Sequence, residues 1–213
     1  MKTSGPIMAE RSNIIVVKVG GSLLTLPDLP DRLDVLRGEM PGHWLAIIGG
    51  GDLADQVRLA DREVGLPDEA AHWLAIRAMT IQANRFSAAL NDWTIARSIE
   101  ACPNLWRQGH VAILEPLYFA MWDETASDAP LPHAWGVTSD SLAARVAIQA
   151  KAAQLLLLKS ADLPEENNVP AAVDAGLIDA YFPTAAWDFD PIDVINLRVE
   201  PFVRQSLRPL RRG

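Results

Sequence analysis

Runs of apolar residues, many of them β-branched, predict the strands of this chain. The run at 14–19 (IIVVKV) contains one charged residue and ends in two glycines. Further strands are predicted at 43–48 (HWLAII), 93–98, 110–116 (HVAILEP), 155–158 (LLLL) and 193–197 (DVINL), the last strand of the chain. Continuous apolar runs bounded by turn residues are typical of strands buried on both faces, as in a parallel sheet.

Segments with helical spacing separate these runs. Leu29, Leu33 and Leu36 recur at helical intervals within 27–40. Helices are also predicted at 52–64, 67–91, 99–108 (broken by Pro103), 138–150 and 170–175, and a polar loop at 123–133. Strands that alternate with helices indicate an α/β fold with a mainly parallel sheet. Ligands of such folds bind beyond the carboxyl ends of the strands.

Composition limits the class of protein. The chain has 213 residues, of which 49% are hydrophobic and 22% charged, as expected for one compact domain. Residues 1–12 lack the apolar run of a signal peptide and are interpreted as a flexible leader. The net charge of −8 argues against a nucleic-acid partner, and Arg204, Arg208, Arg211 and Arg212 are interpreted as a solvated tail.

Two further features place the chain in the cell. Its uncharged apolar runs are too short to span a bilayer, which predicts no membrane association. Its single cysteine, Cys102, excludes an internal disulfide and favours a reducing, cytoplasmic location.

Three predicted strands end in groups suited to phosphate. Lys18 precedes Gly20, Gly21 and Ser22; Gly49, Gly50 and Gly51 follow the second strand; Lys159, Ser160 and Asp162 follow a later one. Glycines let backbone N–H groups approach an anion closely, and lysine adds a point charge. Each glycine turn alone fits a simple tight turn equally well. The P-loop pattern GxxxxGK[ST] and the dinucleotide fingerprint GxGxxG do not occur at these turns.

Together these parts suit phosphoryl transfer, which requires positioning and charge neutralisation more than covalent chemistry. Two lysines could hold the phosphates and two glycine turns could align donor with acceptor. Asp140, at a predicted helix start, could orient the lysines.

Four motifs occur in a diagnostic order: VVKVGGSLL, AIIGGGD, GVTSDSLAARVA and LLLLKSADL. In this order they resemble the amino acid kinase superfamily, which includes acetylglutamate, aspartate, uridylate and isopentenyl phosphate kinases. The resemblance implies a three-layer α/β/α sandwich with a mainly parallel sheet, the carbamate kinase-like fold. It also implies a homodimer or larger homo-oligomer, an acceptor lobe at 13–120 and a nucleotide lobe at 121–213. ATP would be the donor, with Mg²⁺ carried by ATP and bound by no direct protein ligand.

The same resemblance assigns roles to individual residues. Lys18, Asp140 and Lys159 match the catalytic positions. The phosphate- and nucleotide-binding positions are Gly20, Gly21, Ser22, Gly49, Gly50, Gly51, Ser160 and Asp162. Acceptor contacts are expected from Asp52, Arg77, Trp135, Thr138 and Ser139; Arg77 shares the helix predicted at 67–91 with His72, Gln82 and Asn84.

Within the superfamily, the segment PLPHAWGVTSDS resembles the small [5-(aminomethyl)furan-3-yl]methyl phosphate kinases of methanofuran and methylofuran biosynthesis. Such an enzyme converts a phosphate monoester into a diphosphate. Isopentenyl phosphate kinases carry a histidine soon after the GGG turn, whereas Asp52 to Asp55 stand here. A uridylate or other small-acid kinase stays open, as does a non-catalytic nucleotide- or oxoanion-binding storage or regulatory protein.

Overall fold

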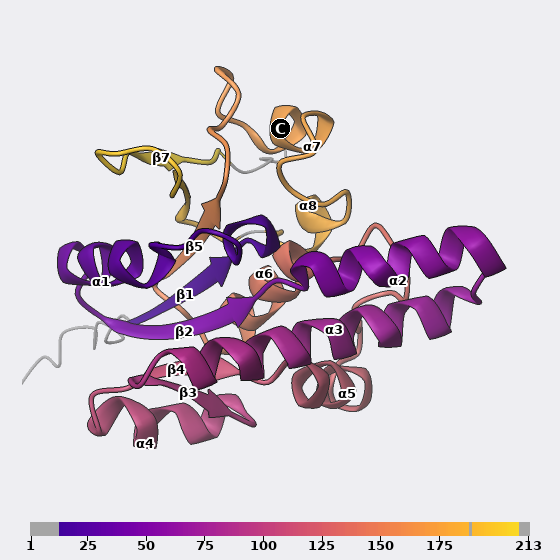
Figure 1. Cartoon of the computed structure of the whole chain (residues 1–213), viewed down its shortest axis with the longest axis horizontal. Helices are drawn as coiled ribbons and strands as arrows, with labels where there is room; N and C mark the ends of the chain where they lie inside the picture. The colour runs from indigo at the N-terminus through magenta and orange to yellow at the C-terminus, as the bar shows by residue number, and fades with distance from the viewer. Residues whose placement is uncertain (1–12, 188, 209–213) are drawn as a thin grey trace, which may run out of the picture.

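A computed structural model describes residues 13–187 and 189–208. The predicted leader, residues 1–12, lies outside the described residues. A seven-stranded sheet forms the centre of the molecule (Figure 1). Its strands lie in the order β3 (Trp93–Ala96), β4 (Val111–Leu114), β2 (His43–Ile48), β1 (Ile14–Val19), β5 (Gln154–Lys159), β6 (Ile192–Asn196) and β7 (Arg204–Ser206). Every neighbouring pair is parallel except β6 and β7.

Helices cover both faces of the sheet. They are α1 (Leu29–Glu39), α2 (Gly51–Val64), α3 (Asp68–Ala89), α4 (Cys102–Arg107), α5 (Pro116–Ala126), α6 (Ser139–Gln149), α7 (Val169–Asp174) and α8 (Phe182–Ala185), with 3₁₀ turns η1 (Gly21–Leu23) and η2 (Ile99–Ala101). Helices α2 and α3 lie side by side and extend beyond the sheet (Figure 1). The structure thus confirms the predicted α/β sandwich with a mainly parallel sheet.

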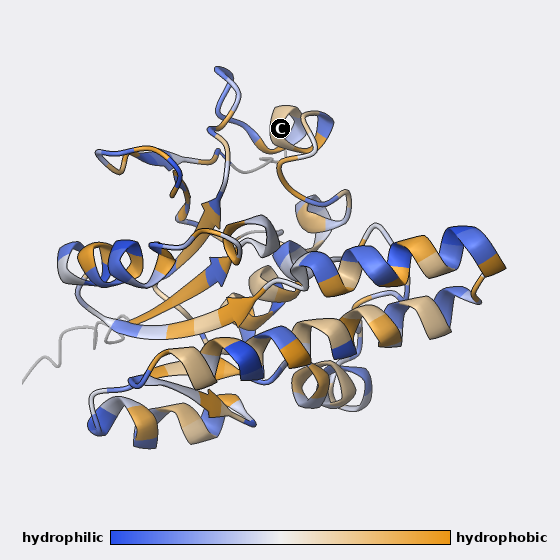
Figure 2. Cartoon of the chain, viewed as in Figure 1, coloured by the Kyte–Doolittle hydropathy of each residue, from blue (hydrophilic) through white to orange (hydrophobic). Residues whose placement is uncertain are grey.

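Alternation along β1 explains why both faces are covered. Ile15, Val17 and Val19 pack with α1 on one face, whereas Val16 packs with α6 on the other. Figure 2 accordingly shows the central strands coloured mainly as hydrophobic. A strand buried on both faces reads as a continuous apolar run, which is why the sequence reveals it.

Several predicted boundaries were wrong. The loop predicted at 123–133 begins in a helix, because α5 runs to Ala126 and buries Asp123 against Arg145. Pro103 does not break a helix but lies in the first turn of α4, where its missing N–H costs nothing. The strand predicted to end the chain is followed by β7, which pairs antiparallel with it.

The interpretation of the C-terminal arginines also changes. Arg204 belongs to β7, and Arg208 forms an isolated bridge with Asn168. Arg211 and Arg212 lie outside the described residues. Cys102 is fully buried. None of the helices in residues 13–187 and 189–208 is long and apolar enough to cross a membrane.

Strand register brings the predicted motifs together. Lys18 is paired with Ile47 of β2 on one side and with Leu157 of β5 on the other. The carboxyl ends of β1, β2 and β5 therefore meet at one edge of the sheet. The predicted acceptor and nucleotide lobes share this one continuous sheet, and their division of labour stays a prediction.

Candidate functional site

The two glycine turns pack directly against each other at the carboxyl edge of the sheet. The N–H of Gly20 donates to the carbonyl of Leu158 (2.9 Å), which anchors the first turn to β5. A Cβ atom on Gly21 would lie 2.5 Å from the backbone nitrogen of Gly51, and one on Gly49 would lie 2.7 Å from the nitrogen of Gly21. Side chains cannot be accommodated at these distances, so the close backbone approach requires glycine.

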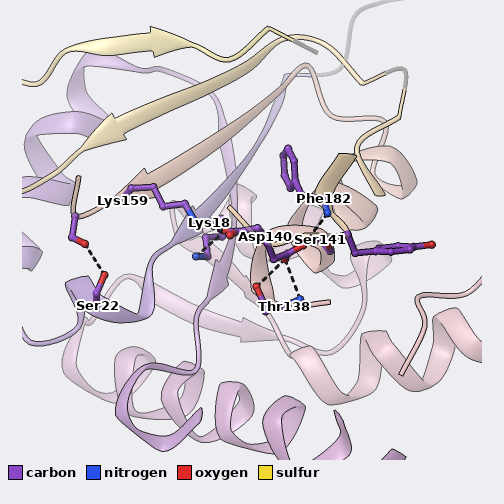
Figure 3. A network of polar contacts seen from close by, with 10 residues as sticks. Lys18, Ser22, Thr138, Asp140, Ser141, Lys159 and Phe182 are labelled. Carbon is purple, nitrogen blue, oxygen red and sulfur yellow. Dashed lines mark hydrogen bonds and ion pairs between the residues drawn. The ribbon is translucent and has the colours of Figure 1, made fainter. Parts of the chain in front are cut away.

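Lys18, Asp140 and Lys159 form a buried ion cluster beside these turns (Figure 3). The ammonium of Lys18 lies 2.9 Å from Oδ1 of Asp140. The ammonium of Lys159 donates to both carboxylate oxygens, at 2.7 and 2.8 Å. All three side chains are 6–8% exposed. Two cations thus share one anion, and the cluster carries one surplus positive charge.

Burial and mutual interaction shift the pKa values of this cluster. Burial alone would raise the pKa of Asp140, but attraction to Lys18 and Lys159 outweighs it and lowers that pKa to about 2. Burial, then repulsion from Lys18, lowers the pKa of Lys159 to about 8, although Asp140 offsets part of this shift. An incoming anion would relieve the repulsion, so the cluster is electrostatically prepared for a phosphoryl group.

Asp179 holds the start of α6, and with it Asp140, in place. One carboxylate oxygen accepts from the N–H and hydroxyl of Thr138 (3.0 and 2.8 Å) and from the N–H of Ser141 (2.9 Å). The other oxygen accepts from the Ser141 hydroxyl and from the N–H groups of Tyr181 and Phe182 (Figure 3). The sequence suggested that Thr138, Ser139 and Asp140 cap this helix themselves, whereas the cap comes from Asp179, which is 41 residues away from Thr138.

A cavity of about 660 Å³ opens over the ion cluster. Its inner end is formed by Lys18, the glycine turns, Lys159 and Ser160. Helices α2 and α3 and the loop before α6 form a second end, with Arg58, His72 and Trp135 among its residues. The guanidinium of Arg58 lies 5.5 Å from the Trp135 ring centroid, and Trp135 donates to Asp61 at 2.7 Å.

The structure gathers most of the predicted site residues around this cavity. Those that line it are Lys18, Gly20, Gly21, Ser22, Gly50, Gly51, Trp135, Thr138, Ser139, Asp140, Lys159 and Ser160. Ser22 and Ser160, 138 residues apart in sequence, share a hydrogen bond of 2.9 Å (Figure 3). Gly49 supports the turn from behind. Their assigned roles stay predictions.

Three predicted residues lie elsewhere. Arg77 lines a groove between α3 and α5, because it projects from another side of α3 than His72 and Met79. Asp52 accepts a hydrogen bond from Gln82 and does not line the cavity, and Asp162 is exposed beyond its rim. Asn84 is exposed and bonds to the Thr80 carbonyl.

Sequence reasoning missed three residues of the cavity: Asp55, Arg58 and Asp179. For Asp55 and Arg58, a signal was available, because they lie one turn and two turns into the helix that follows the GGG turn. For Asp179, the DAGLIDAYFP segment gave no indication that its carboxylate would reach α6. No group of three or more His, Cys, Asp or Glu side chains in the described residues is arranged to hold a metal ion.

Comparisons with known proteins agree with this geometry. The model of the amino acid kinase family matches residues 13–163. The fold is similar to the uridylate kinase of Archaeoglobus fulgidus, with a TM-score of 0.60, 16% identity, and 84% of this chain and 89% of that chain covered. It is similar to the UMP kinase of Ureaplasma parvum, with a TM-score of 0.64, 15% identity, and 90% and 93% covered. A search of curated protein sequences finds no significant match. Because the family model covers most of the chain and the fold agrees, this chain belongs to the amino acid kinase family.

Proposed function

We propose that this protein is an ATP-dependent phosphotransferase whose acceptor is a small phosphate monoester or carboxylate. The observation that carries the proposal is the sharing of Asp140 by Lys18 and Lys159 beside two interlocked glycine turns. A storage or regulatory protein needs an anion site but has less use for two buried ammonium groups on one carboxylate.

The site suits ATP as the donor. The cavity volume is in the range of pockets that enclose small ligands. The two ammonium groups and the turns at Gly20–Gly21 and Gly49–Gly51 would hold the phosphates and neutralise the charge that develops during transfer. Both oxygens of Asp140 are occupied by lysines, so Mg²⁺ would be held through the phosphates of ATP and would bridge and neutralise their oxygens.

The carboxylates of the cavity favour an acceptor that is already ionised. Asp140 is bound to two lysines, Asp179 accepts six hydrogen bonds, and Asp55 pairs with Arg58 at 2.8 Å. Thus none of the described carboxylates that line the cavity is free to remove a proton from an alcohol. An acceptor phosphate or carboxylate oxygen needs no base. It would attack the γ-phosphorus, the bond to the β-phosphate oxygen would break, and ADP would leave with that electron pair.

We propose [5-(aminomethyl)furan-3-yl]methyl phosphate as the acceptor. The proposal rests on the resemblance of the Trp135 segment to kinases of that compound, and the cavity is compatible with it. A flat ring would meet Trp135, Ile76 and Met79, and an ammonium group would find the carboxylate of Asp55. UMP is the second candidate, because two proteins of similar fold are described as uridylate or UMP kinases.

Coupled ADP release in the presence of ATP, Mg²⁺ and single acceptors tests both proposals. The panel contains the furan phosphate, UMP, isopentenyl phosphate, acetylglutamate and aspartate. Turnover that depends on the furan phosphate supports the full proposal, whereas turnover with UMP alone keeps the kinase and replaces its acceptor. Tight ATP binding without turnover on any acceptor would contradict the kinase and favour a binding role.

A further inference from the structure

His72 is a buried polar side chain in the wall of the cavity that the proposed chemistry does not use. It lies near the start of α3 and is 8% exposed. Within residues 13–187 and 189–208 its ring nitrogens have no hydrogen-bond partner in the protein. A buried polar group without a partner costs about 1–3 kcal/mol. Its position in a ligand-sized cavity indicates that a ligand supplies the missing partner.

The surroundings of His72 hold the ring still. It stacks on His133 with the ring centroids 4.4 Å apart and an angle of 16° between the planes. His133 in turn lies 2.7 Å from a carboxylate oxygen of Glu124, and Trp73 packs edge-on against both histidines. Three elements, α3, α5 and the loop before α6, thus fix one imidazole. A ring that only filled space would not require this support.

The charge state of His72 defines what it can recognise. Burial, together with the neighbouring His133, lowers its pKa to about 4. At neutral pH the ring is uncharged, so it offers one hydrogen-bond donor and one acceptor. It is therefore unsuited to binding a phosphate by charge. It suits a neutral or donor group such as a ring oxygen, hydroxyl, amide or amine.

The neighbours of His72 in the cavity wall are apolar. Ala75, Ile76 and Met79 follow it along α3, and Trp135 lies in the loop before α6. The cavity therefore has a charged end at the lysines and a largely apolar end with one directional polar group. This arrangement matches an acceptor with an ionised group at one end and a compact body that carries one hydrogen-bonding atom.

We propose that His72 is a specificity-determining residue, which hydrogen-bonds a polar atom in the body of the acceptor. This inference rests on the proposed kinase function and adds to it which end of the cavity selects the acceptor. A site that hydrogen-bonds its substrate rejects analogues that lack the bonding atom, because the buried polar group is then left unpaired. The nucleotide, held at the phosphate end, does not contribute to this selection.

The first test compares wild type, His72→Phe and His72→Asn in steady-state assays with the furan phosphate and with UMP. Phenylalanine keeps a flat ring against His133 but removes both nitrogens, and asparagine restores a donor and an acceptor. We expect His72→Phe to raise the KM of the preferred acceptor about tenfold or more and to reduce its preference over the other acceptor. The KM of ATP should change less than about twofold, and His72→Asn should recover part of the loss.

His110→Phe is the matched control. His110 precedes β4 at the opposite end of the strands and hydrogen-bonds Thr94, so its loss removes one hydrogen bond far from the cavity. It should leave both KM values unchanged. Equal KM values for the acceptor in wild type and His72→Phe would overturn the inference, and so would an equal rise in the KM of ATP.

A binding measurement decides the case if His72→Phe does not fold. The chain has four histidines, so the ring carbon signals of the labelled wild-type protein are few, and His72→Asn identifies the one of interest. Addition of the furan phosphate or UMP should shift that signal, and addition of ATP alone should not. If acceptor binds and is phosphorylated without moving the signal, the inference fails while the kinase stands. If neither acceptor binds nor reacts, the proposed function and this inference fail together.

Discussion

The two ends of the cavity are built in different ways. The phosphate end consists of backbone and charges at the ends of β1, β2 and β5, where the Lys18–Asp140–Lys159 cluster is almost fully buried. The acceptor end consists of side chains on α2, α3 and the loop before α6. Strand ends are fixed on both sides by sheet pairing, whereas helix side chains can change without disturbing the sheet. The comparison suggests that the chemistry is set by the sheet and the choice of acceptor by the helices.

Loss of one shared lysine should give the largest effect. Lys159→Ala leaves the transferred group with a single ammonium, so we expect kcat/KM to fall about 10²–10³-fold. Lys151→Ala is the matched control, because Lys151 is an exposed lysine at the far end of α6. Steady-state ADP release measures both variants. Equal activity of Lys159→Ala and wild type would remove the phosphate end from the account.

Separation of the glycine turns should weaken folding and nucleotide binding together. Gly21→Ala places a methyl group against the nitrogen of Gly51, and such overpacking costs about 1–3 kcal/mol of unfolding free energy. Gly38→Ala is the control: no atom lies within 4 Å of the added carbon, and the change within α1 should stabilise by about 0.5–1 kcal/mol. Denaturant unfolding and ATP titration measure both. Equal stabilities would show that the turns do not need their close contact.

The charge on Lys159 should govern the alkaline side of the pH profile. Its pKa is lowered to about 8, and the protonated form is the one that binds phosphate, so kcat/KM should fall as pH rises through about 8. Asp140→Asn removes the anion that favours this charge, so the fall should move about one unit or more to lower pH. Activity of the variant at pH 8 should then be about tenfold lower than that of wild type. An unchanged midpoint would assign the alkaline limb to another group.

Arg77→Ala should have the smallest effect and marks the boundary of the acceptor end. The sequence suggested Arg77 as an acceptor contact, but its side chain lines the groove between α3 and α5. Both KM values should stay within about twofold of wild type, as for a surface substitution. A tenfold rise in the KM of the acceptor would show that the acceptor reaches this groove.

The same division explains what the sequence could predict. Strands β1, β2 and β5 are buried on both faces and read as apolar runs, and the lysines and glycines that follow them indicate the phosphate end. The acceptor end depends on which side of α2 and α3 faces the cavity. For α3 the hydrophobic pattern does not separate His72 from Arg77, since the helix packs against several neighbours along its length.

Contacts between distant segments were the other gap. Asp123 is buried by its pairing with Arg145, so a stretch that looks polar in sequence continues α5. Asp179 caps α6 across 41 residues, and no local pattern announces this contact. Polar residues that are satisfied only by tertiary partners cannot be told from solvated ones by local sequence.

The most direct test of the central claim is a single-turnover experiment with γ-labelled ATP and the furan phosphate. Wild type and Lys18→Ala are mixed with substrate, quenched, and analysed for label in the diphosphate product, with the affinity for ATP measured separately. We predict that wild type transfers the label and that Lys18→Ala transfers it about 10³-fold more slowly, while the affinity for ATP changes less than about tenfold. Transfer at the wild-type rate by Lys18→Ala would contradict the claim that two lysines on one carboxylate form the catalytic centre.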